Sequence, residues 1–218
     1  MAAPQLDLVV WYADLGRPYL PLIQQCTASA KRAMPYIRTV LLTPTPSREL
    51  GACFDKMVEL PGLPADQNTI CIDRVKATVS WQSMTQNRTI YADPDIEFNR
   101  EIPFDGSFDV GLLWRPRYPA QPINTGIVLA EPGHQDFWRH YGAIAVNLPK
   151  PLHSWWCDQL AYTVMLGTLH IAGDTVKAHD ARVKLFDMHS HCTAREKVTS
   201  DNPWAWHDKG QRKWSAAA

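Results

Sequence analysis

The sequence predicts an α/β fold in which a mostly parallel sheet carries helices on both faces. Short apolar runs of strand length alternate with longer helical segments, so the first half of the chain is expected to be β-α-β-α-β. Crossovers between parallel strands are right-handed and place helices on both faces of such a sheet. With 218 residues and 45% hydrophobic content, the chain is long enough to bury a real core.

The predicted elements of the first half follow from apolar runs and their breakers. Residues 8–12 form an apolar run that predicts a buried strand. Residues 19–34 predict a helix, because Pro18 lies near its start and Pro35 stops it. A second strand is expected at 37–43, a second helix at 70–84, and a third strand at 89–92, which runs into Asp93.

The second half predicts the same two kinds of element. Strands are expected at 109–113, 126–130, 169–172 and 183–186, and helices at 135–146 and 155–166. In the last helix Trp156, Leu160 and Val164 recur at i, i+4 and i+8, which predicts a buried stripe. From Asp187 onward the pattern predicts irregular chain that is rich in His, Trp and Lys.

Charge and composition narrow the class of protein. Lys plus Arg and Asp plus Glu both number 22, which argues against a protein whose whole surface binds nucleic acid or an anionic membrane. No apolar run approaches the length of a membrane span, and the N-terminus lacks the pattern of a signal peptide. The five cysteines are widely spaced and form no CxxC motif, so we expect free thiols in a reducing, cytoplasmic compartment.

Polar residues that end the predicted strands mark a candidate ligand site. In parallel sheets ligands bind beyond the carboxyl ends of the strands, and this rule indicates Asp14, Thr43 and the region of Asp93. Asp93-Pro94-Asp95 puts two carboxylates two residues apart at a strand end, with a proline to stiffen the backbone. Such a pair is a natural site for a hard cation, although an acidic turn with solvated side chains has the same pattern.

Three further segments each allow two interpretations. Residues 124–129 either form a strand start with a turn or present polar groups to a ligand at the lip of the sheet. Asp158 either complements a helix dipole or serves as a base or as a partner of a substrate hydroxyl. Residues 207–214 either form a basic solvated tail or bring an imidazole for a metal and cations for a diphosphate.

In chain order, four segments resemble motifs of the GT-A glycosyltransferases, which are nucleotide-diphospho-sugar transferases. They read TIYADPDIEF with Asp93 and Asp95, NTGIVLA from Asn124, DQ at Asp158, and HDKGQRK from His207. The last is similar to the closing HxxGxxK motif of glycogenin-like and lipopolysaccharide galactosyltransferase-like enzymes. The resemblance covers roughly residues 7–214 and implies a Rossmann-like sheet with an irregular C-terminal lid. It implies one domain at 1–214, divided into a nucleotide-binding half (7–100), an acceptor half (101–186) and the lid (187–214).

The resemblance also implies a role for each matching residue. Asp93 would contact the ribose or the metal, and the metal, Mn²⁺ or Mg²⁺, would have the ligands Asp93, Asp95 and His207. The diphosphate would lie on Lys209, Gly210 and Lys213, and the base and ribose on Ala13, Asp14 and Thr43. Arg74 would approach the nucleotide or the sugar. The donor sugar and the acceptor would be flanked by Asn124, Asp158 and Gln159.

The function implied is metal-dependent transfer of a sugar from a nucleotide-sugar, most simply a UDP-sugar, to an acceptor glycan or another hydroxyl. The closing motif favours retention of anomeric configuration; an inverting enzyme would need a base, and Asp158 is the candidate. Two alternatives stay open on the same fold. The acceptor could be a modified base in DNA, or the chain could be a catalytically silent sugar- or nucleotide-binding scaffold.

Overall fold

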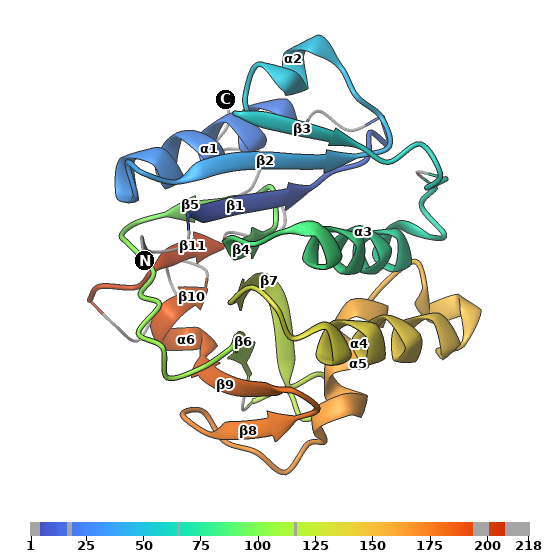
Figure 1. Ribbon diagram of the computed structural model, residues 1–218, viewed down its shortest axis with the longest axis vertical. Coiled ribbons are helices and arrows are strands. Elements are labelled where there is room, and N and C mark those ends of the chain that lie inside the picture. The colour runs from blue at the N-terminus through green and yellow to red at the C-terminus, as the bar shows by residue number, and fades with distance from the viewer. Residues whose placement is uncertain (1–4, 17–18, 65, 116, 194–200, 208–218) are drawn as a thin grey trace.

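The computed structural model describes residues 5–16, 19–64, 66–115, 117–193 and 201–207 (Figure 1). Its strands are β1 (Leu6–Trp11), β2 (Arg38–Thr43), β3 (Lys56–Glu59), β4 (Arg88–Ala92), β5 (Ile96–Phe98), β6 (Val110–Trp114), β7 (Ile123–Ala130), β8 (Thr175–Ala178), β9 (Ala181–Asp187), β10 (Cys192–Thr193) and β11 (Ala205–His207). Its helices are α1 (Leu20–Ala33), α2 (Arg48–Gly51), α3 (Ile70–Met84), α4 (Gln135–Asn147), α5 (Cys157–Leu166) and α6 (Met188–His191), with a 3₁₀ turn at Lys150–Leu152.

The described strands build one large sheet and one small one. The large sheet has eight strands in the order β3-β2-β1-β4-β7-β6-β9-β8. All of them run in one direction except β7 and β8, which are antiparallel to their neighbours. The small sheet has the order β10-β11-β5, and its strand β5 is the element that follows β4 in the chain. The mostly parallel sheet expected from the sequence is therefore confirmed.

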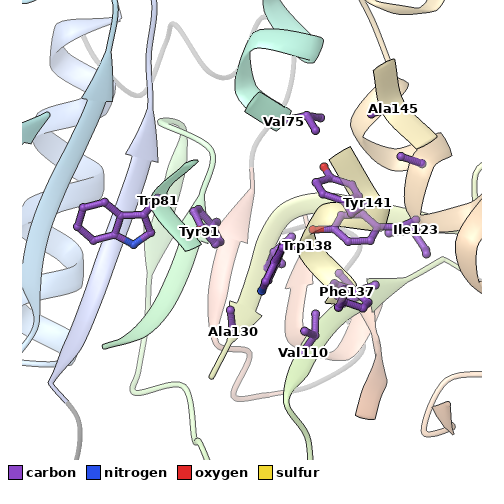
Figure 2. Packing of buried hydrophobic residues seen from close by; sticks show 14 of the residues in the cluster. Val75, Trp81, Tyr91, Val110, Ile123, Ala130, Phe137, Trp138, Tyr141 and Ala145 are labelled. Carbon is purple, nitrogen blue, oxygen red and sulfur yellow. The ribbon is translucent and has the colours of Figure 1, made fainter. Parts of the chain in front are cut away.

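Each face of the large sheet has its own apolar core, because side chains alternate along every strand. On one face Val9 and Tyr91 pack against α3, α4 and α5, and Figure 2 shows the aromatic part of this layer around Trp138 and Tyr141. On the other face Leu8 and Ile90 pack against α1 and the small sheet. Figure 1 shows α1 and the group α3, α4 and α5 as separate layers, so helices cover both faces as expected.

Most predicted elements of the large sheet and its helices appear within two residues of their expected bounds. The helix predicted at 70–84 has the bounds of α3, and the strands predicted at 8–12, 37–43 and 89–92 are β1, β2 and β4. The sequence pattern missed β3, β5 and β8, which are only three or four residues long. The strand predicted at 169–172 is wrong, since the chain turns there and Leu169 and Ile171 are exposed.

The segment after Asp187 contains more regular structure than its composition predicts. Its described part holds α6, β10 and β11. Trp204 is buried against Phe186 and His191, and β11 pairs antiparallel with β5. The pairing partner, β5, lies over a hundred residues earlier in the chain, so local sequence gives no sign of it. This pairing carries His207 back to the end of β4.

Two further expectations concerned free thiols and membrane-spanning helices. All five cysteines are free, and Cys26, Cys157 and Cys192 are buried. Of the helices within the described ranges, none is both long enough and apolar enough to cross a bilayer.

A buried ion pair joins the first two strands of the large sheet. Asp7 on β1 is fully buried and accepts hydrogen bonds from Arg38 Nε at 2.9 Å and Arg38 NH2 at 2.8 Å. Asn87 adds a third hydrogen bond to Asp7 Oδ2 at 3.0 Å. The buried carboxylate has lost its hydration, and the hydrogen bonds from Arg38 and Asn87 offset that loss. Removal of one member of the set therefore leaves the others without a partner.

We expect Asp7→Ala to lower the free energy of unfolding by about 3 kcal/mol, because Arg38 and Asn87 then lose their acceptor in a partly buried place. Urea unfolding followed by circular dichroism measures the change. Asp136→Ala is the matched control, since it breaks an exposed pair with Arg139 on α4 and should cost less than about 1 kcal/mol. Equal losses in the two variants would contradict the prediction.

Candidate functional site

A cavity of about 590 Å³ opens beyond the carboxyl ends of β1 and β4 and beside the start of β7. The N-terminal turns of α3 and α5 close its other side. The described residues that line it are Trp11, Tyr12, Ala13, Leu15, Tyr19, Gln67, Ile70, Cys71, Arg74, Asp93, Pro94, Asp95, Thr125, Ser154, Trp155, Trp156, Asp158, Gln159 and His207. This is the edge of the sheet at which α/β folds bind their ligands.

Asp93, Asp95 and His207 form a cluster in this cavity. One ligand atom from each lies within 4.8 Å of the other two. His207 Nε2 is 3.5 Å from Asp93 Oδ2 and 3.4 Å from Asp95 Oδ1, and the imidazole is almost wholly buried. The contact exists because His207 pairs with Ile96, the residue that follows Asp95. The structure therefore brings together the three residues that the resemblance implies as metal ligands.

Gly126 on β7 makes room for the imidazole of His207. A Cβ atom at this position would lie 2.6 Å from His207 Nδ1 and 2.8 Å from Asn124 Oδ1. Real Cβ atoms do not approach other atoms that closely, so any side chain here would displace the imidazole. The glycine of the NTGIVLA segment is thus explained by close packing against a residue of the cluster.

The register of β7 breaks beside the cluster. Leu112 pairs with Val128 while the next residue, Leu113, pairs with Asn124. The intervening residues bulge out of the β6 ladder, and Gly126 O instead accepts a hydrogen bond from Asp93 N at 2.9 Å. Asn124 Oδ1 accepts a hydrogen bond from Gly126 N at 2.9 Å and so holds the bulge. Bulges of this kind redirect side chains near functional sites.

Arg74 on α3 links the cluster to the opposite wall. Its NH1 is 2.6 Å from Asp93 Oδ1 and 3.5 Å from Asp158 Oδ2, and its NH2 donates to Thr125 O at 2.5 Å. Burial opposes the charge of the guanidinium, but the carboxylates of Asp93 and Asp158 outweigh it and raise the pKa of Arg74. Arg74 is therefore a permanent cation that orients both carboxylates.

Asp158 is held at both oxygens. Its Oδ2 accepts from Thr125 Oγ1 at 2.7 Å, and its Oδ1 accepts from Gln159 N at 2.8 Å in the first turn of α5. The neighbouring Gln159 turns its carboxamide oxygen to Arg115 NH2 at 2.7 Å. Burial lowers the pKa of Arg115. These contacts fix the polar wall of the cavity opposite Asp95.

The cluster fits a hard divalent cation. Two carboxylates and one imidazole suit Mn²⁺ and are compatible with Mg²⁺, both of which accept water and phosphate oxygens as further ligands. Burial raises the pKa of the nearby Cys26 thiol, and the charges of Asp95 and Asp93 raise it further, so the cluster sits in a negative field that a cation would neutralise. The space that Gly126 leaves for His207 completes the set of donors.

The structure separates the other predicted site residues into three groups. Ala13, Asp158 and Gln159 line the cavity together with Arg74. Among the described residues that surround the cavity, Asp14, Thr43 and Asn124 are not part of its lining. Thr43 is buried and 3.3 Å from Thr45 Oγ1, while the exposed Asp14 donates its backbone N–H to the same oxygen. Lys209, Gly210 and Lys213 lie outside the described residues.

Pattern reasoning missed most of the aromatic lining. Trp11, Tyr12 and Tyr19 follow from no motif, although the position of Trp11 and Tyr12 at the end of the first strand is a usable signal. The buried stripe predicted for Trp156, Leu160 and Val164 is wrong, because Trp156 is 42% and Val164 60% exposed. The buried side of α5 carries Cys157, Ala161 and Tyr162 instead. The helical period was right and its phase was wrong, since the buried side of α5 is turned by one to two residues from the predicted stripe.

Two solved structures of glycosyltransferases align with almost the whole chain. One is a glycosyltransferase involved in the glycosylation of the major capsid of PBCV-1, at 11% identity and a TM-score of 0.60 over 98% of this chain and 99% of that one. The other is the galactosyltransferase LgtC in complex with donor and acceptor sugar analogues, at 13% identity and a TM-score of 0.58 over 94% and 87%. This chain has the GT-A fold.

The GT-A fold expected from the motifs is confirmed by these two alignments. No protein-family model and no curated protein sequence matches the chain. At such low identity the alignments establish the architecture alone. What the fold does in this chain has to be argued from its own cluster and cavity.

We expect Gly126→Ala to weaken binding of Mn²⁺ roughly 10–100-fold, because the new methyl group displaces His207 from the two carboxylates. Electron paramagnetic resonance of free Mn²⁺ during titration measures the affinity. Gly51→Ala is the control, since its Cβ would meet nothing closer than Met57 Cε at 3.7 Å. Unchanged Mn²⁺ affinity in Gly126→Ala would show that His207 is not a ligand.

Proposed function

We propose that this chain is a metal-dependent glycosyltransferase that moves a sugar from a nucleotide-diphosphate sugar to a hydroxyl-bearing acceptor. The observation that carries the proposal is the cluster of Asp93, Asp95 and His207 at the carboxyl edge of a GT-A sheet. The cluster opens into a cavity large enough for a ligand of this size.

The residues of this cavity suit the chemistry of sugar transfer from a nucleotide-diphosphate sugar. The bond between the anomeric carbon and the diphosphate breaks, the acceptor oxygen bonds to that carbon, and the acceptor hydroxyl passes its proton to an oxygen of the leaving diphosphate. Negative charge grows on the leaving diphosphate. A bound divalent cation supplies Lewis-acid stabilisation of that charge, without transfer of a proton. The chain's own contribution is to hold Asp93, Asp95 and His207 in place before the donor arrives.

Arg74 has a supporting role in this proposal. It holds Asp93 Oδ1 at 2.6 Å, which leaves Oδ2 directed to the imidazole side of the cluster. Asn124 is proposed as a positioning residue rather than a substrate contact, because it holds Gly126 and so the space for His207. The proposed diphosphate contacts of Lys209, Gly210 and Lys213 follow from the resemblance alone.

The surroundings of Asp158 support the retaining course. A general base for an inverting reaction needs a carboxylate oxygen that reaches the acceptor hydroxyl. Both oxygens of Asp158 already accept hydrogen bonds, and only 3% of the residue is exposed. Its geometry suits a charge partner of Arg74 better than a base. Gln159, which has more exposure, is the proposed contact with the donor sugar.

The remaining details of the proposal come from the resemblance. UDP is the proposed nucleotide and Mn²⁺ the proposed ion, with Ala13, Asp14 and Thr43 around the base and ribose. The division at 7–100, 101–186 and 187–214 is proposed as functional, since Asp93, Asp158 and His207 each come from a different part. A reducing, cytoplasmic compartment is proposed from the free thiols.

Asp95→Asn should reduce sugar transfer or donor hydrolysis by more than roughly a hundredfold, because the amide is a weak ligand for a hard cation. Release of nucleoside diphosphate from the donor measures the rate. Asp105→Asn, at an exposed loop carboxylate, is the control and should retain full activity. A fully active Asp95→Asn would overturn metal dependence, and an inactive wild type would favour a silent scaffold.

A panel of nucleoside diphosphates tests the donor site by thermal shift, each with and without Mn²⁺. At a hundred times Kd the proper nucleotide should add about 2.7 kcal/mol of stability, which is roughly 5–10 °C in Tm for a chain of this size. We expect the shift for UDP and only with Mn²⁺. A larger shift for another base would correct the donor, and no shift for any nucleotide would overturn the proposal.

A further inference from the structure

The cavity has aromatic residues on two opposite sides of the metal cluster. Tyr12 and Tyr19 follow β1, with ring centroids 5.9 Å apart, while Trp155 and Trp156 precede α5. In the sheet the order is β1-β4-β7, and α5 packs over β7. The end of β4, with Asp93, therefore lies between the two aromatic groups. A ligand that spans the cavity meets one aromatic group on each side of the cluster.

Trp155 and Trp156 are exposed to the cavity. The exposed fractions are 62% for Trp155 and 42% for Trp156, whereas the described tryptophans at 11, 81, 114, 138 and 204 are all buried. An exposed indole costs hydration free energy that a buried one does not. Ligand sites are lined mostly by apolar and aromatic side chains with a few polar groups among them. Two consecutive exposed indoles on the wall of a cavity fit this description.

The backbone holds these two indoles in fixed places. Trp155 N donates to Leu152 O at 3.3 Å, and Trp156 O accepts from Leu160 N at 2.9 Å. The segment is tied to α3, because Ile72 N donates to His153 O at 3.2 Å. Trp156 itself has φ of 77°, a left-handed conformation that side chains with a Cβ rarely adopt. Residues with such strained backbone are common at ligand sites, where the unusual conformation positions a side chain toward the ligand.

The polar groups beside the indoles match the edge of a sugar ring. Gln159 lines the cavity, and its carboxamide oxygen accepts a hydrogen bond from Arg115 NH2 at 2.7 Å, so its amide nitrogen is the group that can donate to a ligand. Ser154 also lines this side. A pyranose has one face of C–H groups and a rim of hydroxyls, so an indole face with hydrogen-bonding groups at its edge is complementary to it.

We propose that Trp155 and Trp156 form the acceptor subsite and that the acceptor is a carbohydrate whose pyranose ring stacks on Trp156. This inference rests on the proposed function, because it assigns the nucleotide to the tyrosine side of the cluster and the acceptor to the tryptophan side. A nucleobase is the competing aromatic ligand. Its place is beside Tyr12 and Tyr19, at the carboxyl end of β1.

The test measures binding of three probe disaccharides, lactose, maltose and cellobiose, by saturation-transfer NMR with UDP and Mn²⁺ present. We expect at least one to bind the wild type and to bind Trp156→Ala roughly tenfold more weakly, with Trp155→Ala also weakened. Trp156→Phe should restore much of the affinity, because it keeps an aromatic face. Val164→Ala, at an exposed apolar residue of α5 that is not part of the cavity lining, is the matched control and should bind like the wild type.

UDP-induced thermal shift in the same variants separates this inference from the proposed function. A normal UDP shift with weakened disaccharide binding in Trp156→Ala supports the inference. A reduced UDP shift with unchanged disaccharide binding assigns the indoles to the nucleobase and overturns it. So does a wild type that binds UDP and none of the disaccharides. A wild type that binds no nucleotide contradicts the proposed function itself. Trp156→Gly is a second variant without the indole. Glycine adopts the left-handed backbone conformation without strain, so this variant should keep the fold if Trp156→Ala does not.

Discussion

The cavity depends on a partly buried cation, the guanidinium of Arg74. It reaches Asp93 at the end of β4, Asp158 at the start of α5 and the carbonyl of Thr125 in the bulge of β7. Without it, two carboxylates on different elements would face each other in a place poor in water, at a high electrostatic cost. With it, the end of the sheet and the helix layer are joined where the ligand would bind, and Asp93 keeps one oxygen for the cluster with His207.

Around this cation, the chain departs from ordinary packing rules at several neighbouring positions. β7 loses its register at 125–127, Gly126 leaves a space that only a glycine permits, and Trp156 stands exposed in a left-handed conformation. Elsewhere the sheet follows plain alternation between two apolar faces, and Figure 2 draws part of the core on one of them. Local departures gathered at one place are the pattern expected where function, rather than stability, selects the residues. The cluster of Asp93, Asp95 and His207 and the two aromatic groups of the cavity both lie there.

Residues whose role depends on local chemistry were accessible from the sequence. Asp93 and Asp95 follow a strand and line the cavity, and Gly126, in a short segment of mixed polarity, packs against His207. Thr43 and Asp14 obey the same strand-end rule, yet Thr43 is buried and the Asp14 carboxylate accepts a hydrogen bond from Gly16 N in its own turn. The rule locates an edge of the sheet, but the rotation of the last residue decides which side chain reaches the ligand. The phase of α5 failed for a similar reason: the spacing of Trp156, Leu160 and Val164 fits a helix, but the tertiary packing decides which side of the helix faces the core.

The sequence by itself determined the alternation of strands and helices, the bounds of α3 and the pair of strand-end carboxylates that lines the cavity, because apolar period, prolines and strand-end carboxylates act over a few residues. Only the tertiary structure decided that β11 returns to pair with β5, that Arg74 joins two carboxylates, and that Trp156 faces a cavity. The physical reason is range. Pairing across a hundred residues and a shared counter-ion depend on how distant segments share the space around one sheet edge, and no local pattern records that.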